Sequence, residues 1–260
     1  NIDKILDGYT FDRNGTAVGG NGQCFSSDKK GMMPTLVDDL YSERVIIKKQ
    51  MIEAQKELQN VVPGDKQKLY DIERRISVAE NQQMAIKILL NSLYGAMGNK
   101  YFRFFDQRIA EAITLSGQLT IRWAEVALNK YLNKVMNTDT DYIIAIDTDS
   151  LYVNLGPLVE QVNPSNPVDF LDKVASEKLE PVLSQAYQEL FDQMGGIDNR
   201  MVMKREAIAD RAIWTAKKRY ILNVHDNEGV RYKEPKLNIM GIEAIKSSTP
   251  APCRDALKEL

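Results

Sequence analysis

Hydrophobic and polar positions follow a helical period over most of the chain and alternate in shorter runs toward its C-terminal end. Between residues 35 and 60, apolar side chains recur at roughly helical spacing, which predicts an amphipathic helix. The same pattern predicts helices over residues 66–94, 106–135 and 168–194. From residue 201 onward, short apolar runs separated by polar turns indicate strands.

The first two predicted helices are separated only by the sequence VVPGD, in which Pro63 and Gly64 favour a tight connection. Two long helices with so short a link form an antiparallel hairpin. Residues 1–34 are rich in glycine and polar residues, which predicts irregular structure with one short hairpin. The order of elements predicts an α+β fold, in which a mostly antiparallel sheet is backed by helices and a helical hairpin projects from it.

The composition narrows the possible functions only slightly. The 260 residues are 43% hydrophobic, and 34 basic residues face 36 acidic ones, so any binding to phosphate must come from local patches. The chain has no apolar run of 18 residues and no signal-peptide pattern near its start, so we expect no membrane contact. Cys24 and Cys253 fit no metal-binding spacing and are interpreted as reduced thiols, and His225 as a surface histidine.

Two carboxylates lie in the middle of the most strand-like segment, YIIAIDTDSLYVNL. If residues 142–146 and 151–155 pair as strands, Asp147 and Asp149 lie at the tip of a hairpin. Hard cations such as Mg²⁺ prefer carboxylate oxygens, but aspartate and serine also favour turns, so a solvated turn is the alternative. Asp139 and Asp141 lie at the other end of the first strand, roughly 20 Å away, and are interpreted as its solvated entry.

Cationic residues cluster where the predicted hairpin meets the rest of the chain. Arg44 and Lys48 are four residues apart and share a helix face, and Lys87, Asn91 and Tyr94 share a face of the second helix. Cations beside an amide and an aromatic ring suit a triphosphate and its base. The alternative is an ordinary solvated helix face.

Three motifs occur in a specific order: KILLNSLYG at residues 87–95, DTDSLYV at 147–153 and KKRY at 217–220. Together they resemble the fingers-helix, catalytic palm and primer-strand motifs of family B DNA polymerases. The flanking sequence is most similar to the replicative polymerases of T-even-type bacteriophages, over roughly residues 25 to 260. The resemblance implies a DNA-directed DNA polymerase that adds deoxynucleotides to a primer 3′-hydroxyl by two-metal phosphoryl transfer.

The resemblance also implies roles for the residues that match the motifs. For deoxynucleoside triphosphates, it implies contacts to the phosphates and the nascent base pair by Arg44, Lys48, Lys87, Asn91 and Tyr94, with Lys87 also assisting catalysis.

The resemblance also implies which residues bind the metal ions and the DNA. Asp149 and Asp147 would bind two Mg²⁺ ions, and Glu206, in the segment MKREAIA, would be a peripheral ligand. The residues implied to bind primer–template DNA are Lys217, Lys218, Arg219 and Tyr220.

The implied domains are a palm-proximal segment (1–34), fingers (35–95), palm (96–248) and the start of a thumb (249–260). The family's other carboxylate motif, an Asp followed by S-L-Y-P-S, does not occur in this sequence. We therefore expect the chain to be inactive alone and to need another chain or further segments that carry this motif, the exonuclease and the thumb. The alternative is a nucleotide- or DNA-binding piece, or a scaffold, that acts only with a partner. The expected location is the cytoplasm of a bacterial host cell.

Overall fold

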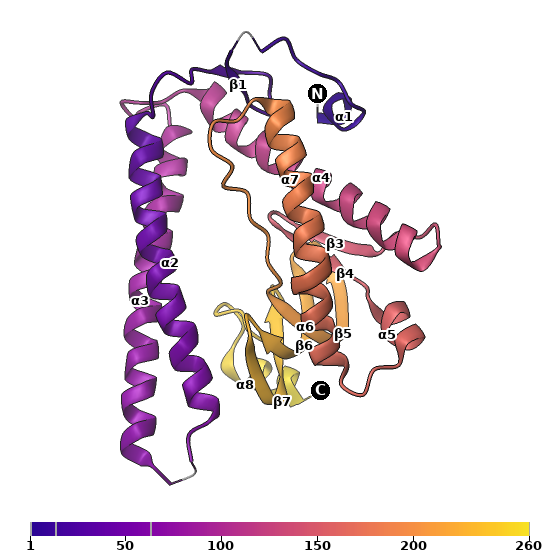
Figure 1. Cartoon of the computed structure of the whole chain (residues 1–260). Helices are drawn as coiled ribbons and strands as arrows, with labels where there is room; N and C mark the ends of the chain where they lie inside the picture. The colour runs from indigo at the N-terminus through magenta and orange to yellow at the C-terminus, as the bar shows by residue number, and fades with distance from the viewer. Residues whose placement is uncertain (1, 14, 63, 260) are drawn as a thin grey trace.

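The computed structural model describes residues 2–13, 15–62 and 64–259, and its fold is mixed α+β, as predicted (Figure 1). Long helices account for most of the regular structure. The helices are α1 (Ile2–Leu6), α2 (Met32–Gln59), α3 (Lys66–Met97), α4 (Gln107–Met136), α5 (Gly156–Val162), α6 (Pro167–Val174), the π-helical turn η1 (Ala175–Leu179), α7 (Glu180–Met194) and α8 (Ala251–Glu259).

Among the described residues the strands pair only with antiparallel neighbours, as predicted, but they form three small sheets instead of one. The pairs β1–β2 and β3–β4 are hairpins, and the third sheet has the order β5–β6–β7. The strands are β1 (Ala17–Val18), β2 (Cys24–Phe25), β3 (Ile143–Asp147), β4 (Ser150–Val153), β5 (Ala207–Ala216), β6 (Arg219–Asn227) and β7 (Val230–Met240).

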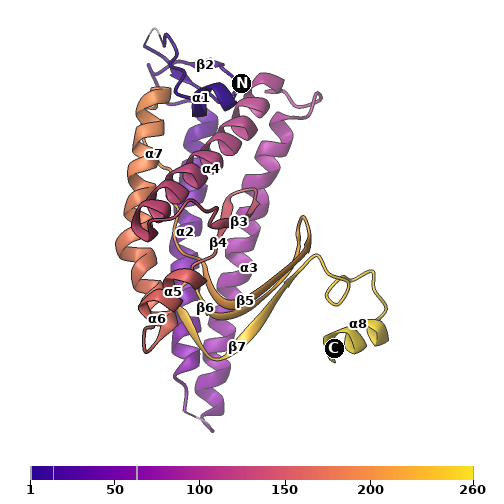
Figure 2. The ribbon, with the colours of Figure 1, turned by 90° about the vertical axis from the view of Figure 1, so that its right-hand side faces the viewer.

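Helices α2 and α3 pack against each other as the predicted antiparallel pair (Figures 1 and 2). The side chain of Asp65 caps α3 by accepting a hydrogen bond from the backbone N–H of Lys68 at 3.1 Å. An ion pair of 2.8 Å between Glu57 and Arg75 links the two helices near their connection. Pro63, predicted to form that connection, lies outside the described residues. One side of α2 packs against β7, which joins the helical pair to the sheet.

The main core lies between α4, the β3–β4 hairpin and α7. Leu128 and Leu132 of α4 pack there with Leu183 and Tyr187 of α7. A second core uses the other end of α4 and α7 and buries α1 through Ile5. Because α1 has five residues, this burial stabilises it rather than helix propensity, and the sequence prediction of irregular structure there was wrong. The sequence analysis also did not identify α5 and α8.

The predicted helix over residues 168–194 is continuous but contains one π-helical turn, η1. Asp172 and Glu180 are eight residues apart, which in a regular α-helix places their side chains roughly 80° apart around the axis. The extra residue of a π-turn reduces this angle to roughly 20°. The turn therefore brings both carboxylates to the same side, where both contact Arg205.

Three predictions from the sequence concern membrane contact, the two cysteines and His225. No helix in the described part of the chain is long and apolar enough to cross a membrane. Cys24 and Cys253 are exposed and free. His225, predicted to be a surface histidine, lies half-buried on β6 with its Nε2 atom 3.3 Å from Oδ1 of Asp210.

Candidate active site

The carboxylate hairpin forms as predicted, and its tip is unusually tight. Asp147 ends β3 and Ser150 begins β4, so only Thr148 and Asp149 connect the two strands. The backbone N–H of Asp149 donates to the carbonyl of Asp147 at 2.7 Å, and Thr148 has φ of 57°. These features describe a γ-turn, a strained conformation that is rare in proteins. The turn leaves Asp149 exposed and Asp147 half-buried beside it.

Lys218 reaches Asp147 from a different hairpin. Its Nζ atom lies 3.0 Å from Oδ1 of Asp147, and Thr148 donates a second hydrogen bond to the same oxygen at 3.0 Å. The hydrogen bond from Lys218 lowers the pKa of Asp147, with smaller contributions from Thr148 and the charge of Lys217. Lys218 and Thr148 therefore favour the ionised form of Asp147.

An aromatic cluster of Tyr152, Trp214 and Tyr220 lies next to the contact between Lys218 and Asp147. A hollow of about 260 Å³ lies between the ends of β3 and β4 and the turn between β5 and β6. Tyr220 packs edge-on against Tyr152 there, with ring centroids 5.4 Å apart. Burial raises the pKa of Tyr220, and the negative charges of Asp147 and Glu206 raise it further. Asp147 and Glu206 therefore both lie close enough to the buried Tyr220 to affect its pKa, although Glu206 is itself exposed.

The basic run at residues 217–219 does not act as one patch. Lys218, in the left-handed conformation with φ of 61°, faces Asp147, whereas Arg219 forms an ion pair with Glu243. Lys217, which precedes them, is exposed. Lys218 lies in the turn with positive φ and Arg219 begins β6, so the two side chains leave the backbone from different local conformations.

On the helical pair, the predicted residues lie on the two facing helices. At 1.5 Å per residue, Arg44 and Lys87 both lie roughly 18–20 Å along their helices from the Glu57–Arg75 ion pair, so they are at a similar height. Lys48 forms an ion pair with Glu228. The Nε atom of Arg44 is buried and has no hydrogen-bond partner among the described residues.

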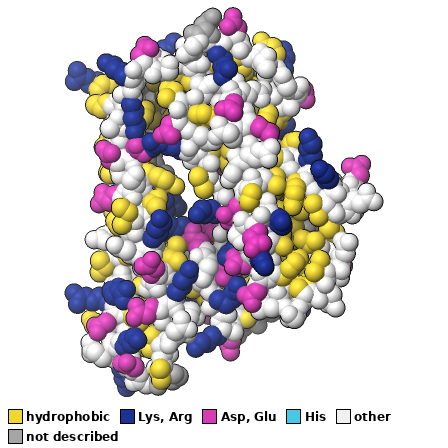
Figure 3. Space-filling model, in the orientation of Figure 1, with side chains coloured by type: hydrophobic (Ala, Val, Ile, Leu, Met, Phe, Trp, Pro, Cys, Tyr) yellow, Lys and Arg dark blue, Asp and Glu magenta, His cyan; other side chains and the backbone are white. Residues whose placement is uncertain are grey.

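Lys87, Asn91 and Tyr94 lie on α3 with exposed side chains. Among the residues that the structure describes, no hydrogen bond or ion pair connects them to the Asp147 turn. The predicted site therefore consists of two groups, one on the helical pair and one on the hairpin ends. In Figure 3 the face between the helical pair and the rest of the molecule is hollowed, and Lys and Arg side chains gather along it.

Most of the chain matches a known protein family. The family model described as DNA polymerase family B matches residues 12–248. The chain belongs to DNA polymerase family B. The resemblance found in the sequence motifs is confirmed.

Relatives of this family B chain include two phage proteins. The DNA-directed DNA polymerases of Escherichia phage RB69 and Enterobacteria phage T4 are each 43% identical to it, over 206 and 204 residues. These alignments cover 74% and 73% of this chain, and 23% of each phage protein. A more distant relative, DNA polymerase beta of African swine fever virus (isolate Tick/Malawi/Lil 20-1/1983), is 27% identical over 231 residues, which are 84% of this chain and 18% of that protein. The chain thus spans less than a quarter of the length of these relatives.

Membership of the family B polymerases raises the question of a metal site. Asp147 and Asp149 offer the oxygen ligands that Mg²⁺ prefers, and the exposure of Asp149 leaves them accessible. Within residues 2–13, 15–62 and 64–259, however, no group of three or more His, Cys, Asp or Glu side chains could hold a metal ion. The donor atoms therefore fit Mg²⁺, but the described part of this family B chain supplies an incomplete set.

The second acidic pair, Asp139 and Asp141, stays apart from this site. Oδ1 of Asp141 accepts hydrogen bonds from Asn129 at 2.8 Å and from the backbone N–H of Ile143 at 2.9 Å. These bonds fasten the start of β3 to α4, which gives Asp141 a structural role.

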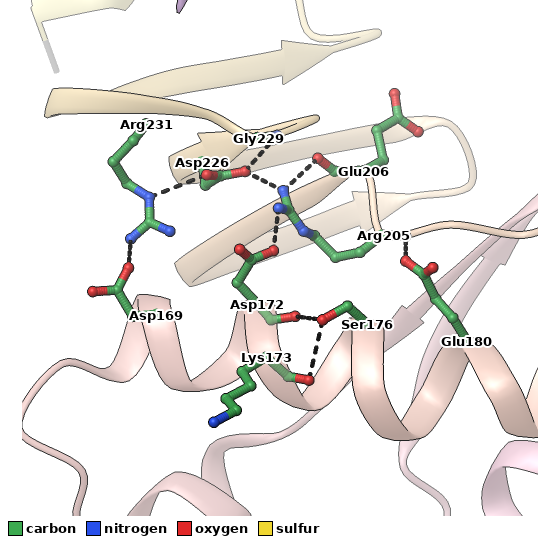
Figure 4. A network of polar contacts seen from close by, with 10 residues as sticks. All are labelled: Asp169, Asp172, Lys173, Ser176, Glu180, Arg205, Glu206, Asp226, Gly229 and Arg231. Carbon is green, nitrogen blue, oxygen red and sulfur yellow. Dashed lines mark hydrogen bonds and ion pairs between the residues drawn. The ribbon is translucent and has the colours of Figure 1, made fainter.

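The sequence analysis missed a buried ionic network beside Glu206 (Figure 4). Asp226 on β6 is 1% exposed and contacts both Arg205 and Arg231. These arginines contact Asp172 and Asp169 of α6. We define the five residues as the Asp226 network. In Figure 4 the carboxylate of Glu206 points away from this network.

A sequence signal for Asp226 did exist. Tyr220, Leu222, Val224 and Asp226 occupy every second position of β6, and all four are buried. Alternation in a strand places them on one face, so the pattern required a partner for a carboxylate in the fourth position.

Proposed function

We propose that this chain is the fingers and palm part of a DNA-directed DNA polymerase. In this proposal residues 35–95 are the fingers, 96–248 the palm, 1–34 a palm-proximal segment and 249–260 the start of the thumb. The observation that carries the proposal is the contact between Lys218 and Asp147, in a chain of this family. It brings the predicted primer-strand motif and the predicted carboxylate motif together from two separate hairpins.

In the proposed reaction, the carboxylate turn and the basic turn hold opposite sides of the primer end. Asp149 and Asp147 would hold Mg²⁺, with Glu206 as a peripheral helper. When bound, Mg²⁺ would activate the primer 3′-hydroxyl and neutralise charge on the phosphates of the incoming deoxynucleotide. Lys217 and Lys218 would contact the DNA backbone, because an ammonium group binds phosphate as a point charge.

Tyr220 steadies this arrangement from below. The ring is anchored by Tyr152 and Trp214, so its position is fixed by packing. Burial raises the pKa of its hydroxyl further above neutral pH. A rigid support of this kind would fix the positions of Lys218 and Asp147 relative to the primer strand.

The proposed nucleotide site lies on the helical pair. Arg44, Lys48, Lys87 and Asn91 would bind the triphosphate, and Tyr94 would lie beside the nascent base pair. The unpartnered Nε atom of Arg44 supports this role, because a buried donor needs an acceptor and phosphate oxygens would provide one. The proposed fingers would move toward the palm when the nucleotide binds.

Catalysis would need more than this chain. Two metal ions about 3.5–4 Å apart need carboxylates from more than one side, and the described residues offer only one turn. We propose that further segments or a separate chain supply the remaining carboxylate, the exonuclease and the thumb. A second candidate function, favoured by the same incomplete ligand set, is a nucleotide- and DNA-binding piece that acts only with its partner.

Primer–template binding tests the proposed function. Replacing Lys217, Lys218 and Arg219 by Ala should weaken binding of a primer–template duplex and reduce the slope of log affinity against log salt by about one unit for each lost phosphate contact. The matched control replaces three exposed cations of α3, Lys66, Lys68 and Arg74, by Ala. It removes the same charge far from the carboxylate turn and should leave most of the affinity. Equal effects of the two triple variants would contradict the proposed DNA site.

A further inference from the structure

The helical pair contacts the sheet where α2 packs against β7 and the turn between β6 and β7. Lys48 of α2 forms an ion pair with Glu228 of this turn, and the two side chains are 32% and 26% exposed. Farther along α2, Lys56 lies near the next residue of the turn, with its Nζ atom 3.1 Å from where a Cβ on Gly229 would be. Two lysines of α2 therefore lie next to two successive residues of the β6–β7 turn.

The turn itself has an unusual residue at its first position. Only Glu228 and Gly229 connect β6 to β7, and both have positive φ, of 50° and 81°. Glycine, asparagine or aspartate usually occupies such a position, because a longer side chain is disfavoured in the left-handed region. A glutamate here is held at a conformational cost, and its side chain has the reach to contact α2.

The backbone around Glu228 is fixed by two hydrogen bonds. The N–H of Glu228 donates to the carbonyl of Glu206 at 2.6 Å, and the N–H of Gly229 donates to Oδ1 of Asp226 at 2.9 Å. Asp226 is the centre of the Asp226 network, which ties the turn to α6 (Figure 4). Glu228 therefore presents its carboxylate from a rigid support.

Lys48 has a second potential anionic partner if the proposed function holds. Arg44 lies one helical turn away with its buried Nε atom unpartnered, so a triphosphate bound there would come within reach of Lys48. Lys48 cannot keep its contact with Glu228 and also direct all its donors to phosphate. The carboxylate and the triphosphate would compete for one ammonium group.

We propose that Glu228 is a positioning residue that holds Lys48 against the palm and competes with the triphosphate for it. This inference rests on the proposed nucleotide site. Removing the carboxylate should free Lys48 and strengthen triphosphate binding, whereas removing Lys48 should weaken it. The contact is half-exposed, so the gain should be modest, about 2- to 5-fold in affinity.

Calorimetric titration of the chain with inorganic tripolyphosphate tests this proposal. The variants are Glu228→Gln, Lys48→Ala and the double variant that combines them. Glu228→Gln should bind about 2- to 5-fold more tightly than the wild type. In the Lys48→Ala background the same substitution should change the affinity little, because the competition requires both groups.

Two further variants control for the loss of negative charge and for the stability of the turn. Glu234→Gln removes an exposed carboxylate of β7 that has no ion pair among the described residues, so it measures the general effect of lost negative charge. Glu228→Asn removes the reach of the side chain while suiting the left-handed turn, so it should reproduce the gain in a stably folded chain. A thermal unfolding curve for each variant confirms that it is folded.

The outcomes separate this inference from the proposed function. If Lys48→Ala weakens binding while Glu228→Gln and Glu228→Asn leave it unchanged, the competition is wrong and the proposed nucleotide site stands. A gain in Glu234→Gln equal to that in Glu228→Gln would also overturn the competition. If neither Lys48→Ala nor Arg44→Ala changes tripolyphosphate binding, the proposed nucleotide site itself is wrong.

Discussion

Two donors bind one oxygen of Asp147 and favour its ionised form. Lys218 and Thr148 each lie 3.0 Å from Oδ1, and the backbone of the turn leaves Asp149 free of this contact. The Lys218–Asp147 pair is partly exposed, so its contribution to stability is small. Its importance lies in the chemistry of the site, since only an ionised carboxylate is a good ligand for a hard cation.

The substitution Lys218→Ala should raise the pKa of Asp147. The hydrogen bond from Lys218 is the main cause of the low pKa, so without it Asp147 should approach its ordinary value of 3.8 and take up a proton at higher pH. Carbon-13 NMR of the aspartate carboxyl groups, recorded during a pH titration, measures this shift. Lys217→Ala is the control and should give a smaller rise, because Lys217 acts only through its charge. An unchanged Asp147 titration in Lys218→Ala would contradict the assigned contact.

At the scale of elements, two irregular turns position the carboxylates of the candidate site and of the neighbouring ionic network. The π-turn η1 turns Asp172 and Glu180 toward Arg205, and the γ-turn between β3 and β4 exposes Asp149. Strand β6 links the two regions, with Tyr220 near the carboxylate turn at one end and Asp226 in the ionic network at the other. Because β6 is continuous, loss of the network should loosen the strand that supports Lys218.

Asp226→Asn should destabilise the fold strongly. The carboxylate is buried between Arg205 and Arg231, and removing its charge leaves these arginines only their more exposed partners, Asp172 and Asp169, which should cost up to about 3–5 kcal/mol in the free energy of unfolding. Denaturant unfolding at neutral pH measures the difference. Asp169→Asn, at the exposed rim of the same network, is the control and should cost less than about 1 kcal/mol. A similar loss in both variants would show that burial of Asp226 is unimportant.

The lowered pKa of Asp226 predicts that the stability of the fold depends on pH. Burial alone would raise the pKa of Asp226, but the hydrogen bond from the backbone of Gly229, the charge and hydrogen bond of Arg205 and the hydrogen bond from Arg231 lower it below 3.8. A lowered folded-state pKa stabilises the protein above the unfolded-state value, and this stabilisation is lost as the pH falls through the folded-state value. The wild type should therefore lose more stability on acidification than Asp226→Asn does.

These elements differ in how far the sequence predicts them. The α2–α3 pair and the carboxylate hairpin depend on local periodicity and a short connection, and both were predicted. The π-turn was not, because residues 168–194 keep a helical pattern whether or not one turn is widened. The contacts of Lys218 with Asp147 and of Lys48 with Glu228 join distant segments, and only tertiary packing determines them.

At the scale of the whole molecule, the candidate residues lie on two bodies that meet along one side. The helical pair carries Arg44, Lys48 and Lys87, and the sheets carry the carboxylate and basic turns (Figure 1). The contact between α2 and β7 joins them through Glu228. A nucleotide that bound both groups would draw them together, which suits a site that is completed by closure.

The isolated chain should not extend a primer. The carboxylate turn offers ligands from one side only, so a second metal ion would bind weakly and the attacking hydroxyl would be poorly aligned. An extension assay with labelled primer–template, Mg²⁺ and all four deoxynucleotides measures this, and the assay should show no added nucleotides. Extension that depends on Asp149, and disappears in Asp149→Asn, would show that the chain holds a complete site.

The central claim is that the turn at Asp147 and Asp149 is the cation-binding part of a polymerase site, and Mn²⁺ titration followed by NMR tests it most directly. In the presence of dATP, substoichiometric Mn²⁺ should broaden the backbone amide signals around residues 147–150. Asp149→Asn should abolish this broadening, whereas Asp139→Asn, in the other acidic pair, should leave it intact. Broadening that centres on residues 139–141, or that persists unchanged in Asp149→Asn, would contradict the account.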